Sequence, residues 1–377
     1  MILDRIERVP LWRTHQSDGK SLASEGARAC PRSKKSATSS RHSLIAIVLT
    51  CLPLLAPATA HANDTTAEYA IGGLRFTADA EIAMQSEDLF ISTSEVRVSY
   101  VFVNRGKADK TVLIAFPMPD ITGSFDFING VPTKNPDNPF DFHVTANGQP
   151  VALALDQHIL AKGVDQTERL RKAHIPLMPP APETDQALDR LSEADKAEYV
   201  KLGLAAIDEY TDKPNAPMEK HLIAMWTLRA AFTWQQSFPA GREVRLEQTY
   251  KPSVGGVVIT SIGGKDWRKN PESAAYLEKY CLDADFIASV TRAMARKKVD
   301  YPPFSEQRIS YILKTGANWA GPIGSFRLVV DKGEADRLVS FCADGVKKIG
   351  PTQFEVRKTN FTPKQDLDIL LLVPMAQ

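Results

Sequence analysis

The sequence lacks the short motifs that mark the common enzyme classes. It contains no G-x-S-x-G nucleophile turn, no H-E-x-x-H zinc motif, no paired C-x-x-C units and no phosphate-binding loop. Its S-x-x-K match, Ser17 to Lys20, lies ahead of a predicted export signal. We therefore expect no catalytic residues and no cofactor. The absence of motifs still leaves room for an enzyme whose groups come together from distant strands.

An apolar run of membrane-spanning length is also missing. The stretch Ser43 to Ala56 has about fourteen residues, whereas a spanning helix needs roughly 20. Small residues follow at Ala58, Ala60 and Ala62, in the spacing that signal peptidase cleaves. Basic residues precede the stretch: Arg32, Lys34, Lys35 and Arg41. This order predicts a signal peptide cleaved after Ala60 or Ala62, and a periplasmic or secreted protein.

Two other interpretations of the apolar run are weaker. An internal core helix would be broken by Pro53 and Pro57. A lipoprotein anchored at Cys51 would need a better lipobox than Val48-Leu49-Thr50, and the apolar run continues past the cysteine. Residues 1–40 are basic and serine-rich, so they form a long leader or precede the true start codon. In both cases residues 1–62 are expected to lie outside the fold.

The chain that would remain has no strong excess of one charge. Removing residues 1–62 takes away nine of the 46 basic and four of the 45 acidic residues, which leaves a net charge of −4. Such a chain has no bulk attraction for nucleic acid or anionic membranes.

Two cysteines, Cys281 and Cys342, remain after residues 1–62 are removed, and an even number of cysteines in an exported protein predicts a disulfide. The alternative is two separate buried thiols.

Alternation of apolar and polar residues predicts β-strands along most of the chain. Strands are expected from Val96 to Val103 and from Val112 to Phe116, joined by a turn at Asn104 to Asp109 and covered on both faces. A hairpin is expected around Asn147-Gly148, and another pair of strands on either side of Pro239-Ala240-Gly241. Five short strand-like segments lie between Arg308 and Pro374. This spacing is typical of an antiparallel sandwich.

Helical spacing appears in two places. Near 183–212, Ser192 resembles a helix cap, and helical periodicity continues to Tyr210. Near 270–298, Asn270 and then Asp283 or Asp285 are expected to cap two helices. The predicted fold class is therefore mainly β, with antiparallel β-sandwich-like lobes and helical insertions. We expect an N-terminal region at 63–265 and a C-terminal region at 266–377.

Three segments carry a resemblance to a known family. "YVFVNRG…LIAFPMPD" (Tyr100 to Asp120), "GANWAGPIGSFRLVVDKG" (Gly316 to Gly333) and "VSFCADGVKKIG" (Val339 to Gly350) resemble the exported bacterial proteins of the domain of unknown function 4424 family. The resemblance implies export, but it brings no established activity and no catalytic residues. A stretch of 22 residues, "VSYVFVNRGKADKTVLIAFPMP", is also similar to the N-terminal domain of inter-alpha-trypsin inhibitor heavy chains. That similarity implies extracellular protein–protein interaction.

The most unusual segment is the long loop from Pro119 to His143. It is rich in Pro, Gly and Asn, and its candidate ligand-binding residues are Asp120, Asp126, Asp141 and His143. Asp and Asn often hold turns by bonding their own backbone. The same oxygen groups could bind a hard cation such as calcium, or an organic ligand. The sequence leaves these three interpretations open.

Tryptophans supply the remaining candidates. Trp267 and Trp319 lie among glycines, where a tryptophan either stacks on a ligand or anchors its loop. Trp226 and Trp234 share a strand face and form either a sugar platform or part of the core. His143, His158, His174 and His221 do not cluster along the chain.

Two functions fit these observations. The preferred one is an exported, non-catalytic protein that binds an envelope protein or a glycan, without nucleic acid or a membrane span. The alternative is a periplasmic hydrolase with its site on the 119–143 loop.

Overall fold

The computed structural model describes residues 65–70, 73–125, 128–130, 132–211 and 217–375. The predicted signal peptide, its cleavage sites and the candidate Asp126 lie outside these residues. Apart from Thr211, the described residues belong to one compact unit. No helix within the described ranges combines the length and apolar character needed to cross a membrane.

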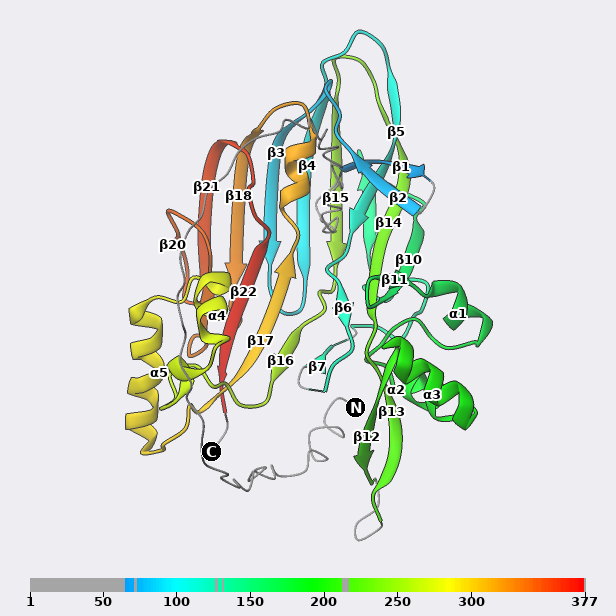
Figure 1. Cartoon of the computed structure of the whole chain (residues 1–377). Coiled ribbons are helices and arrows are strands. Elements are labelled where there is room, and N and C mark those ends of the chain that lie inside the picture. Colours follow the sequence, from blue (N-terminus) through cyan, green and yellow to red (C-terminus); the bar gives the residue numbers. More distant parts are fainter. Residues whose placement is uncertain (1–64, 71–72, 126–127, 131, 212–216, 376–377) are drawn as a thin grey trace, which may run out of the picture. The chain divides into compact units, whose positions relative to one another are not determined.

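The fold is mainly β, as predicted, and an eight-stranded sheet is its largest element (Figure 1). Strands β3 and β18 run parallel, and the other strand pairs described are antiparallel. In spatial order the sheet contains β20 (Lys347–Lys348), β21 (Gln353–Phe361), β18 (Ile323–Asp331), β3 (Ile82–Ile91), β4 (Val96–Asn104), β15 (Glu243–Tyr250), β8 (His143–Ala146) and β9 (Gln149–Pro150).

Three further sheets complete the β-structure of the described residues. A seven-stranded sheet contains β11 (Val164–Asp165), β10 (Ala154–Ala161), β14 (Thr227–Phe238), β5 (Lys110–Pro117), β1 (Thr65–Ala70) and β2 (Gly73–Thr77), with β6 (Ile121–Thr122) beside β14. A five-stranded sheet contains β19 (Leu338–Phe341), β22 (Leu367–Pro374), β17 (Phe304–Tyr311), β16 (Gly255–Val257) and β7 (Ile128–Asn129). β12 (Ala205–Tyr210) and β13 (Glu219–Ala224) form a hairpin.

Strands from both sides of residue 265 share sheets, since β18 pairs with β3 and β17 pairs with β16. The expected division of the chain there stays a prediction.

The inward faces of the three large sheets share one apolar core. Aromatic rings dominate it: Phe142 stacks on Phe232 with 4.5 Å between ring centroids, and Phe102 lies 4.6 Å from Trp319. A second cluster lies between the other face of the five-stranded sheet and the helices α4 (Ser273–Tyr280) and α5 (Ala284–Lys297). The five-stranded sheet is therefore covered on both faces.

Two predicted strand pairs are not hairpins. β4 lies in the eight-stranded sheet while β5 lies in the seven-stranded one, and the same is true of β15 and β14. These turns are arches between sheets, because the apolar faces of consecutive strands meet across the core. Alternation alone does not distinguish the two arrangements. The hairpin at Asn147-Gly148 is confirmed: β8 pairs with β9, and both turn residues have positive φ.

The two arches are held together by Asn104, which is fully buried. Its Nδ2 donates to the carbonyl oxygens of Ala108 at 2.9 Å and Phe238 at 2.8 Å. Its Oδ1 accepts a hydrogen bond from the backbone N–H of Gly106 at 2.8 Å. One amide thus satisfies three backbone groups at the corner between the sheets.

The helices begin mostly where predicted. Ser192 caps α3 (Glu193–Leu202) by accepting from the N–H of Asp195, and Asp283 caps α5. Asn270 does not cap α4, whose preceding residue is Glu272. The prediction that the helix after Ser192 reaches Tyr210 was wrong. Helix α3 ends at Gly203, which adopts a left-handed conformation, and strand β12 follows. The remaining helices are α1 (Thr167–Lys172), α2 (Pro182–Asp189), η2 (Trp267–Lys269) and η3 (Lys314–Asn318).

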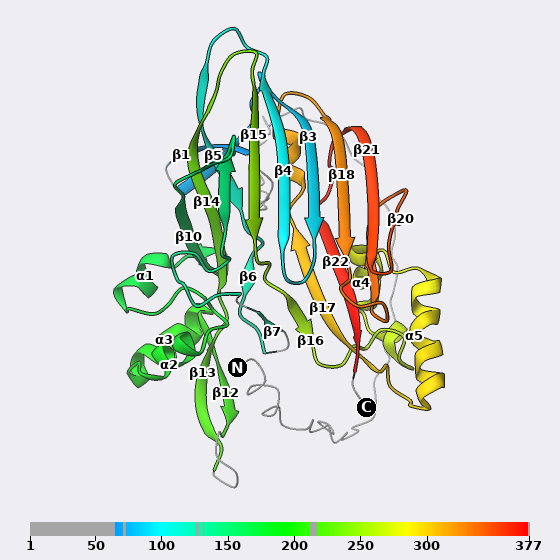
Figure 2. The same cartoon turned by 180° about the vertical axis from the view of Figure 1, so that it is seen from behind.

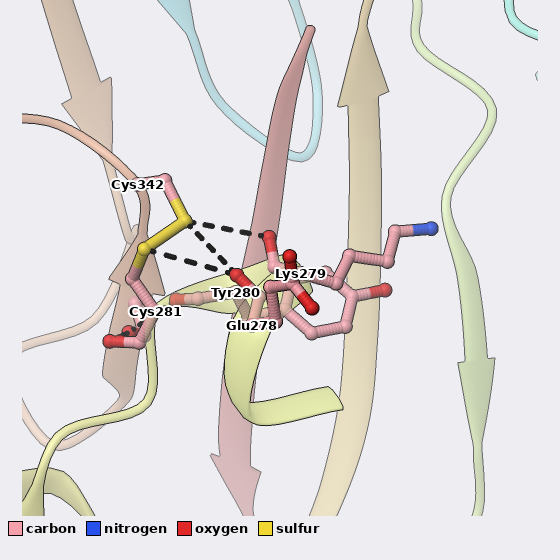
Figure 3. Close-up of a disulfide and its surroundings, with 6 residues drawn as sticks. Glu278, Lys279, Tyr280, Cys281 and Cys342 are labelled. Atoms are coloured by element: carbon pink, nitrogen blue, oxygen red, sulfur yellow. Dashed lines mark hydrogen bonds between the residues drawn. A yellow bond between two sulfur atoms is a disulfide. The ribbon is translucent and has the colours of Figure 1, made fainter. Parts of the chain in front are cut away.

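A Cys281–Cys342 disulfide ties α4 to the five-stranded sheet, as predicted (Figure 3). Cys281 directly follows α4, and Cys342 directly follows β19. The sulfur of Cys342 lies 3.3 Å from the carbonyl oxygen of Glu278. Because a disulfide sulfur carries no hydrogen, this is a packing contact. Ser340 adds a hydrogen bond from its hydroxyl to the carbonyl oxygen of Tyr280 at 2.8 Å.

Candidate functional site

The outer face of the eight-stranded sheet is open. Figure 2 shows β15, β4, β3, β18 and β21 side by side, and no helix of the described chain lies over them. On β4 the inward residues are buried, but Arg97 and Ser99 are exposed and Val101 and Val103 are half-buried. The expectation that the strand from Val96 to Val103 is covered on both faces was therefore wrong. Its alternation reflects one core face and one face open to solvent.

Strand register places the outward side chains in two rows, which we call the polar rows. The first row runs across six strands and contains Arg357, Arg327, Asp88, Ser99, Glu247 and Thr145. The second row contains Glu355, Arg97, Thr249 and His143, with the buried Val329 and the half-buried Phe90 between Glu355 and Arg97. Six strands at their usual spacing span about 24 Å. A hollow of about 510 Å³ lies over the middle of these rows.

Ion pairs hold the rows in place. Arg327 Nε lies 2.8 Å from Glu355 Oε1, and its Nη1 lies 3.1 Å from Asp88 Oδ1. Arg357 Nη2 lies 2.9 Å from the same Glu355 oxygen. The guanidinium of Arg97 lies 4.5 Å from the centre of the Phe90 ring. These contacts fix the polar groups before any ligand arrives, which lowers the ordering cost of binding.

The pKa of Glu355 provides a test of this arrangement. The neighbouring Arg357 and Arg327 lower it to about 2. A carboxyl whose pKa is lowered by folding stabilises the fold above its unfolded pKa, and this contribution is lost as pH falls through the folded value. We expect the carboxyl to remain ionised at about pH 3.5 in a carboxyl-carbon NMR titration. Arg357→Ala should raise its midpoint, and an ordinary midpoint in the unaltered protein would contradict the pairing.

Two of the predicted candidates lie at one end of the open face. His143 Nε2 lies 3.0 Å from Asp141 Oδ1, and Lys251 Nζ lies 3.0 Å from Asp141 Oδ2. Lys251 and His143 lower the pKa of Asp141. The His143 side chain is 66% exposed, so it is available to a ligand that lies along the second row.

Asp120 lies elsewhere. Its Oδ2 is 3.2 Å from Arg229 Nε on β14, in the seven-stranded sheet. Burial raises the pKa of Asp120, partly offset by Arg229. The 119–143 loop therefore does not bring Asp120 together with Asp141 and His143. Among the residues that the structure describes, no group of three or more His, Cys, Asp or Glu side chains could hold a metal ion.

The tryptophan candidates are buried. Trp267 and Trp319 are only 5% and 4% exposed, and each packs in an apolar cluster. This burial favours the interpretation that each tryptophan anchors its loop. Trp226 and Trp234 are also buried, so they belong to the core and not to a sugar platform.

Sequence reasoning missed most of the polar rows. Asp88 and Arg97 lie on the consecutive strands β3 and β4, but Glu247 and Arg327 come from distant segments that only strand pairing brings beside them. A usable signal was present in "EVRLEQTY", Glu243 to Tyr250, where every second residue is polar and exposed. That pattern indicates a strand with one solvated face.

A comparison with known protein families gives a match over most of the chain. A family described as "Domain of unknown function (DUF4424)" matches residues 62–370. The chain belongs to this family. Membership confirms the resemblance seen in the sequence and assigns no activity to the open face.

Comparisons with solved structures and with curated proteins do not indicate a function for the chain. A solved structure from Legionella pneumophila, described as a "putative nutrient binding protein", is 14% identical with a TM-score of 0.36. The likeness covers 82% of this chain and 70% of that one. Likeness of that degree gives no information on what this chain binds. A comparison with curated proteins finds no match.

Proposed function

We propose that this protein is an exported, non-catalytic binding protein that holds a weakly charged envelope glycan across the open face of the eight-stranded sheet. The observation that carries the proposal is the pair of polar rows, fixed by ion pairs and long enough for an extended chain. Hydroxyl groups both donate and accept hydrogen bonds. They can therefore use the carboxylates of Asp88 and Glu247 and the guanidinium of Arg97.

A glycan fits this face better than an envelope protein does. Protein interfaces are centred on apolar and aromatic side chains that become fully buried. None of the large apolar side chains that are strongly exposed in the described residues lies on β3, β4, β15, β18 or β21. Phe90 is half-buried, with the guanidinium of Arg97 over its ring.

The charge of the face favours a weakly charged polymer. Outward positions of the five long strands carry four arginines and five acidic residues: Arg97, Arg245, Arg327, Arg357, Asp88, Glu243, Glu247, Asp331 and Glu355. A nearly balanced face has little long-range attraction for a polyanion. Hydrogen bonding is then the main source of affinity.

The hydrolase alternative has less support. Asp120 lies on the seven-stranded sheet, whereas Asp141 and His143 lie at the eight-stranded one. His143 bonds Asp141, and in the described ranges no hydroxyl or thiol group bonds its ring. A dyad without a nucleophile does not support acyl transfer.

Export is part of the proposal. The Cys281–Cys342 disulfide supports it, because such bonds persist in oxidising compartments. The predicted signal peptide supports it from the sequence. Measuring the intact mass of the periplasmic protein tests cleavage after Ala60 or Ala62.

Binding is tested with a glycan array followed by calorimetry on the best hit, using protein purified from the periplasm. Asp88→Ala, Arg97→Ala and Glu247→Ala each remove a charged hydrogen-bonding group, so each should weaken binding by about tenfold or more. Glu209→Ala and Lys220→Ala, on the separate β12–β13 hairpin, are the matched controls and should bind as the unaltered protein does. Unchanged affinity in all three face variants would refute the proposal, as would binding only to a protein partner.

A further inference from the structure

Exposed apolar side chains lie at one end of the five-stranded sheet, where β16 and β22 finish and β17 starts (Figure 1). Val258 and Ile259 directly follow β16 and are 48% and 50% exposed, while Tyr301, just ahead of β17, is 47% exposed. We propose that this end of the sheet, which we call the basic end and define as residues 258–269 and 292–301, docks on the surface of an anionic phospholipid bilayer. The proposal is independent of glycan binding at the open face.

Contacts of the backbone bring the two segments of the basic end together. Thr260 donates its N–H to the carbonyl oxygen of Phe304 at 2.9 Å. A side chain at Gly264 would lie 3.6 Å from the ring of Pro302, so Lys265 adjoins the start of β17. The exposed residues of the two segments are therefore only a few positions away from the contacts that join them.

The last turn of α5 is fixed at the same place. Lys297 Nζ donates to the carbonyl oxygen of Met375 at 2.9 Å, and the N–H of Met375 donates to the carbonyl oxygen of Pro303 at 3.1 Å. The two neighbours of Lys297 along the chain, Arg296 and Lys298, are exposed. Basic side chains therefore lie beside the apolar ones at this end of the sheet.

The basic end carries an excess of positive charge. Its two segments contain seven basic and two acidic residues, a net charge of +5: Lys265, Arg268, Lys269, Arg292, Arg296, Lys297, Lys298, Asp266 and Asp300. Asp283 and Asp285 lie at the opposite end of α5, about 20 Å away at the helical rise per residue. Counting every residue from 258 to 301 still leaves eight basic against six acidic residues. The sign of the charge complements anionic phosphate head groups.

Three of these cations are available to a lipid head group. Lys265, Arg296 and Lys298 are exposed, and within the part of the chain that the structure describes they have no ion pair and no side-chain hydrogen bond. Lys269 differs, because its Nζ lies 2.7 Å from Asp266 Oδ1. A phosphate can therefore approach the three free cations without breaking an existing ion pair.

The composition of the basic end favours a bilayer over an acidic protein. Lysine is depleted at protein interfaces, yet it supplies four of the seven cations here. A bilayer surface suits the same set, because tyrosine lies at the level of the head groups and long basic side chains reach out to the phosphates. Val258 and Ile259 would then enter the boundary between head groups and acyl chains.

Co-sedimentation of the full mature protein, purified from the periplasm, with lipid vesicles tests the proposal. Vesicles of phosphatidylcholine with about one-third phosphatidylglycerol are the probe, and pure phosphatidylcholine vesicles are the control. We expect saturable binding to the anionic vesicles, at least tenfold weaker binding to the neutral ones, and loss of most binding at about 0.5 M salt, which screens exposed charges.

Three substitutions locate the surface. Lys265→Gln and Arg296→Gln should each weaken vesicle binding by about fivefold, because each removes one cation from beside the anionic surface. Ile259→Ser should weaken it by about tenfold, because it removes an inserted apolar side chain. The matched controls are on the β12–β13 hairpin, where Lys220→Gln and Ile207→Ser change equally exposed residues and should bind as the unaltered protein does.

Soluble polyglutamate distinguishes a bilayer from an acidic protein. Tighter binding to polyglutamate than to the anionic vesicles, with Ile259→Ser as strong as the unaltered protein, would identify an acidic polypeptide as the partner and overturn the proposal. Absence of binding to anionic vesicles, equal binding to neutral ones, or full affinity in all three variants of the basic end would also overturn it.

Discussion

Replacing Cys281 and Cys342 together by alanine should lower the free energy of unfolding by about 4 kcal/mol. The bond closes a loop across 61 positions of sequence, and the chain-entropy model assigns that value to a loop of this length. It ties α4, and with it the second apolar cluster, to the C-terminal strands. Urea denaturation of both proteins measures the difference.

The control for this prediction is the unaltered protein with and without a reductant. Reduction should lower its stability towards that of the double variant, while the double variant should not respond. Alkylation of the denatured, unreduced protein should find no free thiol at either position. Two free thiols, or a double variant as stable as the unaltered protein, would contradict the stabilising role.

Asn104→Ala should lower the free energy of unfolding by about 3 kcal/mol, because buried backbone groups lose their partners. The substitution removes two donors and one acceptor from a fully buried corner. Those groups hold the β4–β5 arch to the β14–β15 arch. Thermal and urea unfolding both measure the effect.

The matched control is Thr111→Ala. Thr111 Oγ1 and Ser237 Oγ form a hydrogen bond of 2.7 Å between β5 and β14, but the pair is exposed. Its loss should cost within about 0.5 kcal/mol, as is usual for surface positions. A similar small cost for Asn104→Ala would show that the arches do not depend on this amide.

Much of the fold followed from local patterns. Ser192 and Asp283 cap helices through their own side chains, and Asn147-Gly148 turns because both residues tolerate positive φ. Each of these features depends on a few neighbouring residues. The arches could not be predicted in this way, because alternation is the same whether consecutive strands pair edge to edge or face each other across a core.

The candidate sites show the same limit. Asp141 and His143 are two positions apart, so their local spacing could have predicted the pairing, although the sequence analysis named them only as separate candidates. The partner of Asp120, Arg229, is 109 positions away, and that of Asp88, Arg327, is 239 away. His158 acquires Asp165 only through the turn between β10 and β11. Where a site is assembled by strand pairing, its residues are recognised only after the register is known.

The proposed glycan site is the open face of the eight-stranded sheet. Titrating the isotopically labelled protein with the best array hit, and following backbone and side-chain NMR signals, tests this most directly. We expect shifts concentrated at Asp88, Arg97, Ser99, Glu247 and Arg327, with His143 shifting when the ligand is long enough to reach β8. Shifts confined to the β12–β13 hairpin, with the polar rows unchanged, would show that the glycan does not bind there.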